Sequence, residues 1–148
     1  MAQGYAPDAL ADRQQIKELV QRFYADAWNR WDDGAVDELL TTDFVFRGSL
    51  GDHAHGRDGF RAYRDKVRSA FPDFHNEVRE VVAEKERAAV RLRCSGRHEG
   101  ELFGIAATGR SVTYEAAAFL YARDAQLCEA WVLGDLEQLR SQLGRGGR

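Results

Sequence analysis

The chain has 148 residues, 44% of them hydrophobic and 30% charged, which is the composition of a globular domain and not of a disordered or fibrous chain. Its 21 basic and 24 acidic residues are spread along the whole length, so no basic stripe predicts binding to nucleic acid. No apolar run reaches the roughly 20 residues that cross a bilayer, and the first residues do not resemble a signal peptide. We expect one domain over residues 1–148, with its core at about 10–144, in the cytoplasm and not at a membrane.

The first part of the chain shows helical periodicity. Apolar residues recur there at intervals of three and four, and Asp12 with Gln15 matches a capping box, which predicts a helix from about residue 13. A short second helix is expected to begin at Asp33 and to end at the polar residues 41–43.

A strand, a loop and a third helix are expected next. Residues 44–47 are apolar and favour a strand, and the three glycines within 48–56 end it in a loop. The helical pattern that starts at Asp58 stops at Pro72, because proline disfavours a helical conformation at the residue before it.

The second half of the chain alternates between apolar and polar residues, which is typical of strands. Four strands are expected, at 78–82, 90–94, 112–121 and 127–133, before a final helix at 136–143. Two of the gaps between them, at 84–87 and 123–126, have the length of hairpin turns, so these neighbours should pair antiparallel. Helices first and strands second predict an α+β domain.

No motif for a metal or a cofactor stands out. Cys94 and Cys128 are too few for a disulfide framework and lack zinc-site spacing, so we expect buried structural thiols. His53 and His55 lie two apart beside Asp52 in a glycine-bearing loop, but three potential ligands in four positions rarely converge without a further anchor. Phosphate and dinucleotide loops are absent from the sequence. We therefore expect no metal and no cofactor.

Several short motifs follow one another in the second half. They are Phe71-Pro72-Asp73, Gly96-Arg97-His98-Glu99-Gly100, Gly104 to Arg110 ending in Thr-Gly-Arg, Glu129-Ala130-Trp131 with Asp135, and Gln142-Leu143-Gly144. In this order and spacing they resemble the SnoaL-like polyketide cyclases of the NTF2-like superfamily. The resemblance implies a cone-shaped, curved antiparallel sheet wrapped around three helices of the N-terminal half. It also implies a deep pocket and a homodimer formed through the outer sheet face.

The resemblance implies cofactor-independent chemistry on a bulky apolar carbonyl compound: cyclisation, isomerisation, dehydration or hydroxylation. Val132 occupies the position of the catalytic aspartate of the polyketide aldol cyclases, and Ala118 occupies that of its accompanying histidine. Neither side chain transfers protons. The alternative is therefore a non-catalytic small-molecule binding or accessory protein of the same fold.

His98 is the first candidate for a catalytic group. Strand parity places it on the inward face with Leu92 and Cys94, and an imidazole titrates near neutral pH, as acid–base catalysis requires. The alternative role is a hydrogen bond that holds the loop at 96–104 in place.

Arg47 and Asp135 are the other catalytic candidates. Arg47 resembles in position the catalytic base of related ketosteroid isomerases, but a guanidinium stays protonated and would instead stabilise an enolate or bind a carboxylate. Its alternative is a surface ion pair with Asp43 or Asp52. Asp135 follows a glycine and could reach the pocket mouth, or could cap the final helix.

Six residues are candidates for substrate binding. The rings of Tyr24, Trp28 and Tyr63 carry polar tips that suit a pocket wall, with core packing as the alternative. Glu115 interrupts an apolar strand, although strand parity favours the outer face. Ala118 and Val132 would form a small apolar wall that leaves room for a bulky ligand, so we expect a roomy pocket with few charges.

Overall fold

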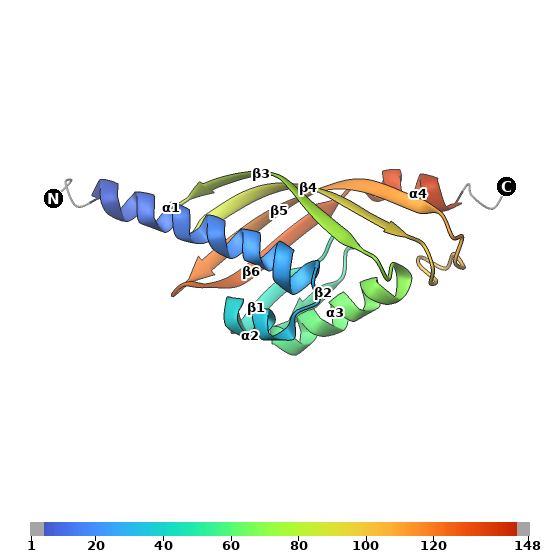
Figure 1. Ribbon diagram of the computed structural model, residues 1–148, viewed down its shortest axis with the longest axis horizontal. Helices are drawn as coiled ribbons and strands as arrows, with labels where there is room; N and C mark the ends of the chain where they lie inside the picture. The colour runs from blue at the N-terminus through green and yellow to red at the C-terminus, as the bar shows by residue number, and fades with distance from the viewer. Residues whose placement is uncertain (1–4, 145–148) are drawn as a thin grey trace.

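Four α-helices, one π-helix and six strands make up the described part of the computed structural model, residues 5–144 (Figure 1). The helices are α1 (Tyr5–Arg22), the π-helix η2 (Phe23–Trp28), α2 (Asp33–Leu39), α3 (Gly56–Ala70) and α4 (Leu136–Gly144). The strands are β1 (Leu40–Arg47), β2 (His53–His55), β3 (His75–Glu84), β4 (Arg87–Arg97), β5 (Ser111–Arg123) and β6 (Gln126–Gly134). The expected α+β class is confirmed.

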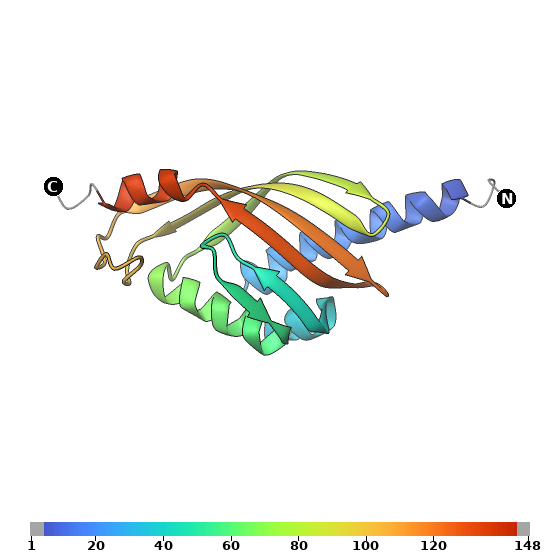
Figure 2. The same ribbon diagram turned by 180° about the vertical axis from the view of Figure 1, so that it is seen from behind.

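The strands form one curved sheet in the order β2-β1-β6-β5-β4-β3, and α1, α2 and α3 lie on the same side of it (Figures 1 and 2). The sheet does not close into a barrel, because β2 and β3 are its edges. Neighbouring strands are antiparallel except β1 and β6, which run parallel. The prediction of a wholly antiparallel sheet was thus wrong for β1 and β6, because no hairpin turn joins these two strands and fixes their relative direction.

The first helix begins earlier than the sequence predicted. It starts at Tyr5, so Asp12 lies within the helix and not at its cap. Pro7 fits in the first turn, where a backbone N–H has no partner within the helix to lose. At its other end, α1 continues directly into η2, a single π-helical segment of six residues.

The second helix begins at Asp33, as expected, and the residue that caps it is the one before, Asp32. Asp32 is the N-cap, and its carboxylate accepts hydrogen bonds from the backbone N–H groups of Gly34 and Ala35 at 2.9 and 3.2 Å. The first backbone N–H groups of a helix have no partner within the helix, and a carboxylate at the N-cap satisfies two of them here. The third helix ends at Ala70, before Pro72, as predicted.

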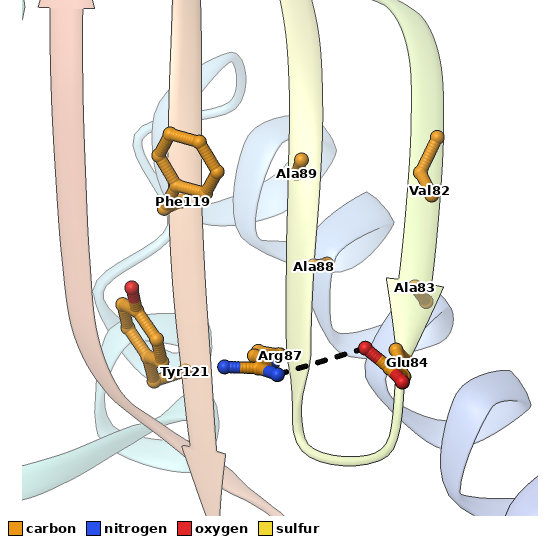
Figure 3. Close-up of a pocket in the computed structure, with 8 residues that line it drawn as sticks. All are labelled: Val82, Ala83, Glu84, Arg87, Ala88, Ala89, Phe119 and Tyr121. Atoms are coloured by element: carbon orange, nitrogen blue, oxygen red, sulfur yellow. Dashed lines mark ion pairs between the residues drawn. The ribbon is translucent and has the colours of Figure 1, made fainter.

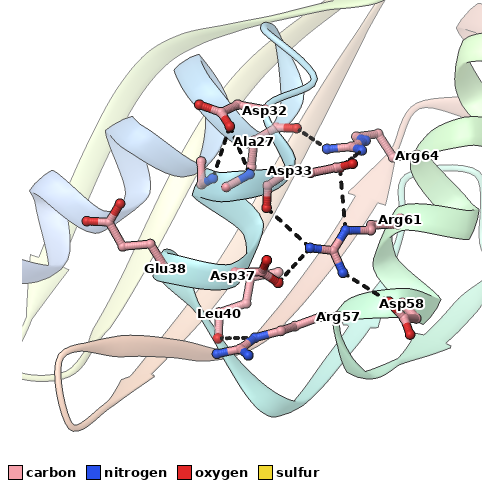
Figure 4. A network of polar contacts seen from close by, with 12 residues as sticks. Ala27, Asp32, Asp33, Asp37, Glu38, Leu40, Arg57, Asp58, Arg61 and Arg64 are labelled. Atoms are coloured by element: carbon pink, nitrogen blue, oxygen red, sulfur yellow. Dashed lines mark hydrogen bonds and ion pairs between the residues drawn. The ribbon is translucent and has the colours of Figure 1, made fainter.

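Arginines on one face of α3 tie it to α2 and η2 (Figure 4). Arg57 donates to the carbonyl of Leu40 at 2.9 Å, and Arg61 donates to the carboxylate of Asp37 at 2.6 Å. The third, Arg64, donates to the backbone of η2 and to an acid of α2. This network fixes α2, α3 and η2 against one another on the helical side of the sheet.

Two strand predictions were incomplete. Residues 41–43, expected as a polar break, belong to β1, where Thr41 is buried while Thr42 and Asp43 are exposed. The register with β6 shifts within this stretch, which explains why the alternation was not recognisable. The expected loop at 48–56 contains β2, a three-residue strand that pairs with β1.

The four strands of the second half are confirmed, and two-residue turns join β3 to β4 and β5 to β6. Asp124 and Ala125 both have positive φ, of 52° and 68°, which is the backbone pattern of a tight hairpin turn. α4 then packs beside β5, where Gln142 accepts from the N–H of Thr113 at 3.0 Å and donates to its carbonyl at 2.7 Å. Because β6 pairs with β5 only from Ala116 onward, α4 covers the edge of β5 before that residue.

Candidate functional site

An interior cavity lies between the helices and the inner face of the sheet. Its volume is about 20 Å³, which is room for about one water molecule or one oxygen atom of a ligand. Apolar and uncharged polar side chains line it: Tyr24, Trp28, Phe46, Ser49, Val67, Phe74, Asn76, Leu92, Cys94 and Val132.

Aromatic side chains occupy most of the cone. Phe60 packs edge-on against Trp28 and Phe46, with ring centroids 5.4 and 5.2 Å apart, and Tyr63 lies 5.0 Å from Phe46. Tyr114, on the same inward row of β5 as Ala118, is also fully buried. The roomy pocket expected behind the small alanine wall is therefore wrong, because neighbouring rings fill that space.

The π-helix supplies one polar group to the cavity. Tyr24 and Trp28, four residues apart on η2, both line the cavity. The hydroxyl of Tyr24 is buried and has no hydrogen-bond partner among the described residues. Burial raises the pKa of this hydroxyl well above its ordinary value, so it stays protonated and can donate. π-Helical segments are rare and occur often at functional sites.

Asn76, near the start of β3, supplies a second polar group. Its backbone N–H donates to the amide oxygen of Asn29 at 2.8 Å, and its carbonyl accepts from the Asn29 amide at 2.9 Å. The thiol of Cys94 donates to its Oδ1 at 3.4 Å. Its Nδ2 group is buried without a partner in the described chain. Asn29 thus holds the backbone of Asn76, and Cys94 holds the oxygen of its side-chain amide, whose donor group is unused.

Cys94 remains a thiol at neutral pH. Burial raises its pKa to about 12, so it serves as a weak donor to Asn76 and not as a nucleophile. The expectation of a buried structural thiol is confirmed for Cys94, whereas Cys128 is only half-buried.

His98 is fully buried, as its predicted inward parity required. Its Nδ1 accepts from the backbone N–H of Thr108 at 3.1 Å and lies 3.0 Å from the Thr108 hydroxyl. Its ring packs against Phe71, with centroids 5.8 Å apart. These contacts hold the segment after β4, which was the alternative role, and His98 is not among the residues that line the cavity.

Arg47 and Asp135 also lie outside the cavity lining. Arg47 donates to the carbonyl of Val132 and stacks over the ring of Trp131 at 5.3 Å, on the outer face of the sheet. Asp135 accepts from the N–H of Gln138 at 3.0 Å, as a helix cap does. The structure therefore does not gather the three catalytic candidates around one cavity, and their roles stay predictions.

The substrate-binding candidates divide between two faces. Tyr24, Trp28 and Val132 line the cavity, while Ala118 is buried next to Val132 on the paired strand. Glu115 lies on the outer face, where its carboxylate accepts from Arg93 at 3.1 Å.

Tyr63, on α3, packs against Trp28 and Phe46 but does not itself line the cavity. Its hydroxyl accepts from the backbone N–H of Leu50 at 3.1 Å, and burial raises its pKa to about 12. It therefore remains a neutral phenol at neutral pH.

No helix among residues 5–144 is long and apolar enough to cross a membrane. Within the same range, no three side chains of the metal-binding types lie together in a metal-binding arrangement, and His53 and His55 both project exposed from β2.

A curved sheet packed on helices around a small interior cavity defines a cone-shaped α+β protein, and solved structures share this fold. A SnoaL-like polyketide cyclase candidate from Jannaschia Sp. CCS1 superposes with a TM-score of 0.79 at 22% identity, covering 89% of this chain and 93% of that one. AclR of Streptomyces galilaeus, a hydroxylase candidate, gives 0.76 at 28% identity, over 90% and 83% of the two chains. IdmH of Streptomyces antibioticus, a polyketide cyclase candidate, gives 0.75 at 26% identity, over 86% and 97%.

The family follows from the sequence as a whole. The model of the SnoaL-like polyketide cyclases matches residues 18–143, and the chain belongs to this family. No curated protein matches the sequence.

Proposed function

We propose that this protein is a cofactor-independent enzyme that binds the carbonyl group of an apolar ring compound and polarises it. One observation carries the proposal: Tyr24 and Asn76 both line an otherwise mainly apolar cavity, and each carries a buried donor, the Tyr24 hydroxyl and the Asn76 amide, without a partner among residues 5–144. Unpaired buried donors are costly, so a carbonyl oxygen that accepts from both would be bound favourably.

The chemistry that this arrangement supports is the activation of a carbonyl. When a water molecule takes a proton from the carbon next to a carbonyl, negative charge moves onto the oxygen, and fixed donors at that oxygen stabilise the charge. Tyr24 stays protonated because of its raised pKa, and Asn76 is held by Asn29 and Cys94. Enolisation is the common step of the cyclisation and isomerisation reactions expected for the family.

A non-catalytic binding protein is the second candidate. The residues that line the cavity include no carboxylate and no imidazole, and Val132 stands at the position of the family's catalytic aspartate. The two candidates differ in one observable. Incubation with 1-tetralone in heavy water would give deuteration at the carbon next to the carbonyl faster than in buffer alone for an enzyme, and binding without faster deuteration for a carrier.

Replacing Tyr24 with phenylalanine tests the role of its hydroxyl. We expect the dissociation constant for 1-tetralone to rise about tenfold, since one buried hydrogen bond is lost. Stability should not fall, because the hydroxyl has no partner in the described protein. Tryptophan fluorescence quenching measures the affinity, and urea titration measures the stability.

Tyr121→Phe is the matched control, because it removes a phenol hydroxyl on the outer face of β5 and should leave both values unchanged. Equal affinity of the Tyr24→Phe variant and the unmodified protein would contradict the proposal.

A second copy of the chain is the partner that we propose for the outer face of the sheet. Five large apolar side chains are exposed among the described residues, and all lie on the strands: Val45, Val82, Phe119, Trp131 and Leu133. Figure 3 shows Val82, Ala89 and Phe119 side by side across three strands, next to the ion pair of Arg87 with Glu84. A contiguous apolar patch of this kind supports a protein interface.

The cytoplasmic location stays a prediction.

A further inference from the structure

A second, larger hollow lies next to the cavity. This groove has a volume of about 470 Å³ and is lined by residues of the turn between β1 and β2, of α3, of the segment after β4, and of α4: Leu50, Asp52, Lys66, Ser69, Glu101, Leu102, Phe103, Gly104 and Arg140. Its walls are more polar than those of the cavity. Sites for small molecules usually have volumes of about 300–1,000 Å³, so the cavity alone is too small for a ring compound and the groove is large enough.

One turn separates the two spaces. The Gly48–Asp52 turn joins β1 to β2, and its consecutive residues face different sides: Ser49 lines the cavity, whereas Leu50 lines the groove. Leu50 is only 9% exposed, so its side chain is packed within the protein at the groove. The turn itself is closed by the N–H of Gly48, which donates to the carbonyl of Asp52 at 2.9 Å.

Side-chain contacts hold this turn in place. The N–H of Leu50 donates to the Tyr63 hydroxyl at 3.1 Å, and the Ser49 and Tyr114 hydroxyls lie 2.8 Å apart in a hydrogen bond. Each such bond contributes about 1 kcal/mol net, which is small beside the stability of a domain. Opening the turn would break these bonds, the Lys66–Asp52 ion pair and the packing of Leu50, and would leave the rest of the fold intact.

The groove offers charged partners for the far end of a ligand. The Arg140 guanidinium lies 4.0 Å above the centre of the Phe103 ring, at the groove wall. Lys66 donates to Asp52 at 2.6 Å, and the Glu101 carboxylate accepts from the N–H of Gly104 at 2.5 Å. Both acids are thus engaged within the protein, which leaves the Arg140 guanidinium best placed to bind a carboxylate.

We propose that the Gly48–Asp52 turn is a gate, and that the cavity and the groove together bind one elongated ligand. Its ring occupies the space that the open turn leaves, with only the carbonyl oxygen in the cavity at Tyr24 and Asn76, and its carboxylate end lies in the groove at Arg140. The ligand class rests on the proposed function, whereas the gate follows from the geometry of the turn alone.

The gate is tested without a ligand. Tyr114→Phe removes the hydroxyl that bonds Ser49 and leaves the acceptor of the Leu50 N–H in place. If the turn opens as a unit, hydrogen exchange of the Leu50 amide should accelerate roughly threefold to tenfold. The amide of Val90 in β4 reports global opening and should not change, nor should either amide in Tyr121→Phe. An unchanged Leu50 rate in Tyr114→Phe would overturn the gate.

The shared site is tested with two probes, 1-tetralone and the same ketone carrying a butanoate chain. Arg140→Met should weaken the butanoate probe about tenfold and leave 1-tetralone unaffected. Tyr114→Phe should raise the association rates of both probes by the factor seen for Leu50 exchange. Equal effects of Arg140→Met on both probes, or no effect on either, would overturn the shared site. Failure of the unmodified protein to bind either probe would refute the proposed function, while the exchange experiment still decides the gate.

Discussion

Replacing Arg64 with alanine is expected to lower the free energy of unfolding by about 3 kcal/mol, because two hydrogen bonds of a buried guanidinium are lost together. Arg64 is only 3% exposed, and it donates to the carbonyl of Ala27 in η2 at 3.0 Å and to the carboxylate of Asp33 (Figure 4). Without it, the Ala27 carbonyl loses this donor. Urea unfolding followed by circular dichroism measures the change.

Arg61 is the matched control, since it lies three residues earlier on the same helix. It contacts three acids, Asp33, Asp37 and Asp58, but these carboxylates are at least 60% exposed. Exposed ion pairs stabilise a protein by about 0–1 kcal/mol, so Arg61→Ala should cost less than Arg64→Ala despite its larger number of partners. A third variant, Arg64→Met, keeps most of the packing. If Arg64→Met restored full stability, the hydrogen bonds would not be the cause.

The same network predicts how stability depends on pH. Arg64, and then Arg61, hold the pKa of Asp33 below its ordinary value. Because the folded-state pKa lies below the unfolded value of about 3.9, this contribution is complete above that value and is lost as pH falls through the folded-state pKa. Asp33→Asn should therefore reduce the loss of stability in acid, measured as urea midpoints at a series of pH values. Asp58→Asn, which removes a fully exposed carboxylate, is the control. Identical acid profiles for Asp33→Asn and the unmodified chain would contradict the assignment.

Much of the fold could be predicted because periodicity reports which side of an element is buried. On β5 the inward row that contains Tyr114 and Ala118 is buried, and Glu115 faces outward, as parity required. The prediction failed where one element gains or loses a residue. In β1 a register shift within residues 40–45 leaves two consecutive exposed positions, which hid the first half of the strand, residues 40–43.

The cavity lining was harder to predict because the position of Asn76 depends on a second register shift, between β3 and β4. Counting outward from the turn between β3 and β4, Cys94 would face Glu77. A register shift between Val78 and Glu80 instead brings Asn76 opposite Cys94, and so places the amide at the cavity. Nothing in the alternation of β3 marks that extra residue.

Arg47, at the end of β1, lies outside the cavity for a different reason. Arg47 follows Phe46 along β1, and successive side chains on a strand point to opposite faces. Since Phe46 is buried, Arg47 faces outward. Its resemblance in position to a catalytic base therefore did not put it in the cavity, and parity within the strand was the signal that could have shown this.

Arg47 instead belongs to a row of side chains that crosses the outer face of the sheet. The register pairs Val82 with Ala89, Ala89 with Phe119, Phe119 with Trp131, and Trp131 with Arg47. The rings of Phe119 and Trp131 are 6.2 Å apart, and the guanidinium of Arg47 covers the indole. These five residues form one strip over five strands, and we term it the outer strip.

Charging the outer strip should therefore separate a dimer formed through this face. Phe119 and Trp131 are 47% and 38% exposed, and buried aromatic side chains dominate the energetics of protein interfaces. A glutamate at either position would bury an unpaired charge against the partner's apolar residues. We expect Phe119→Glu and Trp131→Glu each to raise the dimer dissociation constant by at least about 100-fold, measured by sedimentation velocity across a range of concentrations.

Ala106→Glu provides the matched control, because it adds the same charge at an exposed position of the segment between β4 and β5, away from the outer strip. It should leave the dissociation constant unchanged. A dimer that survives both strip variants would place the interface elsewhere, and a monomeric unmodified protein would remove the proposal. If the strip variants become monomeric yet bind 1-tetralone with unchanged affinity, the cavity works within one chain, as its burial on the opposite side of the sheet requires.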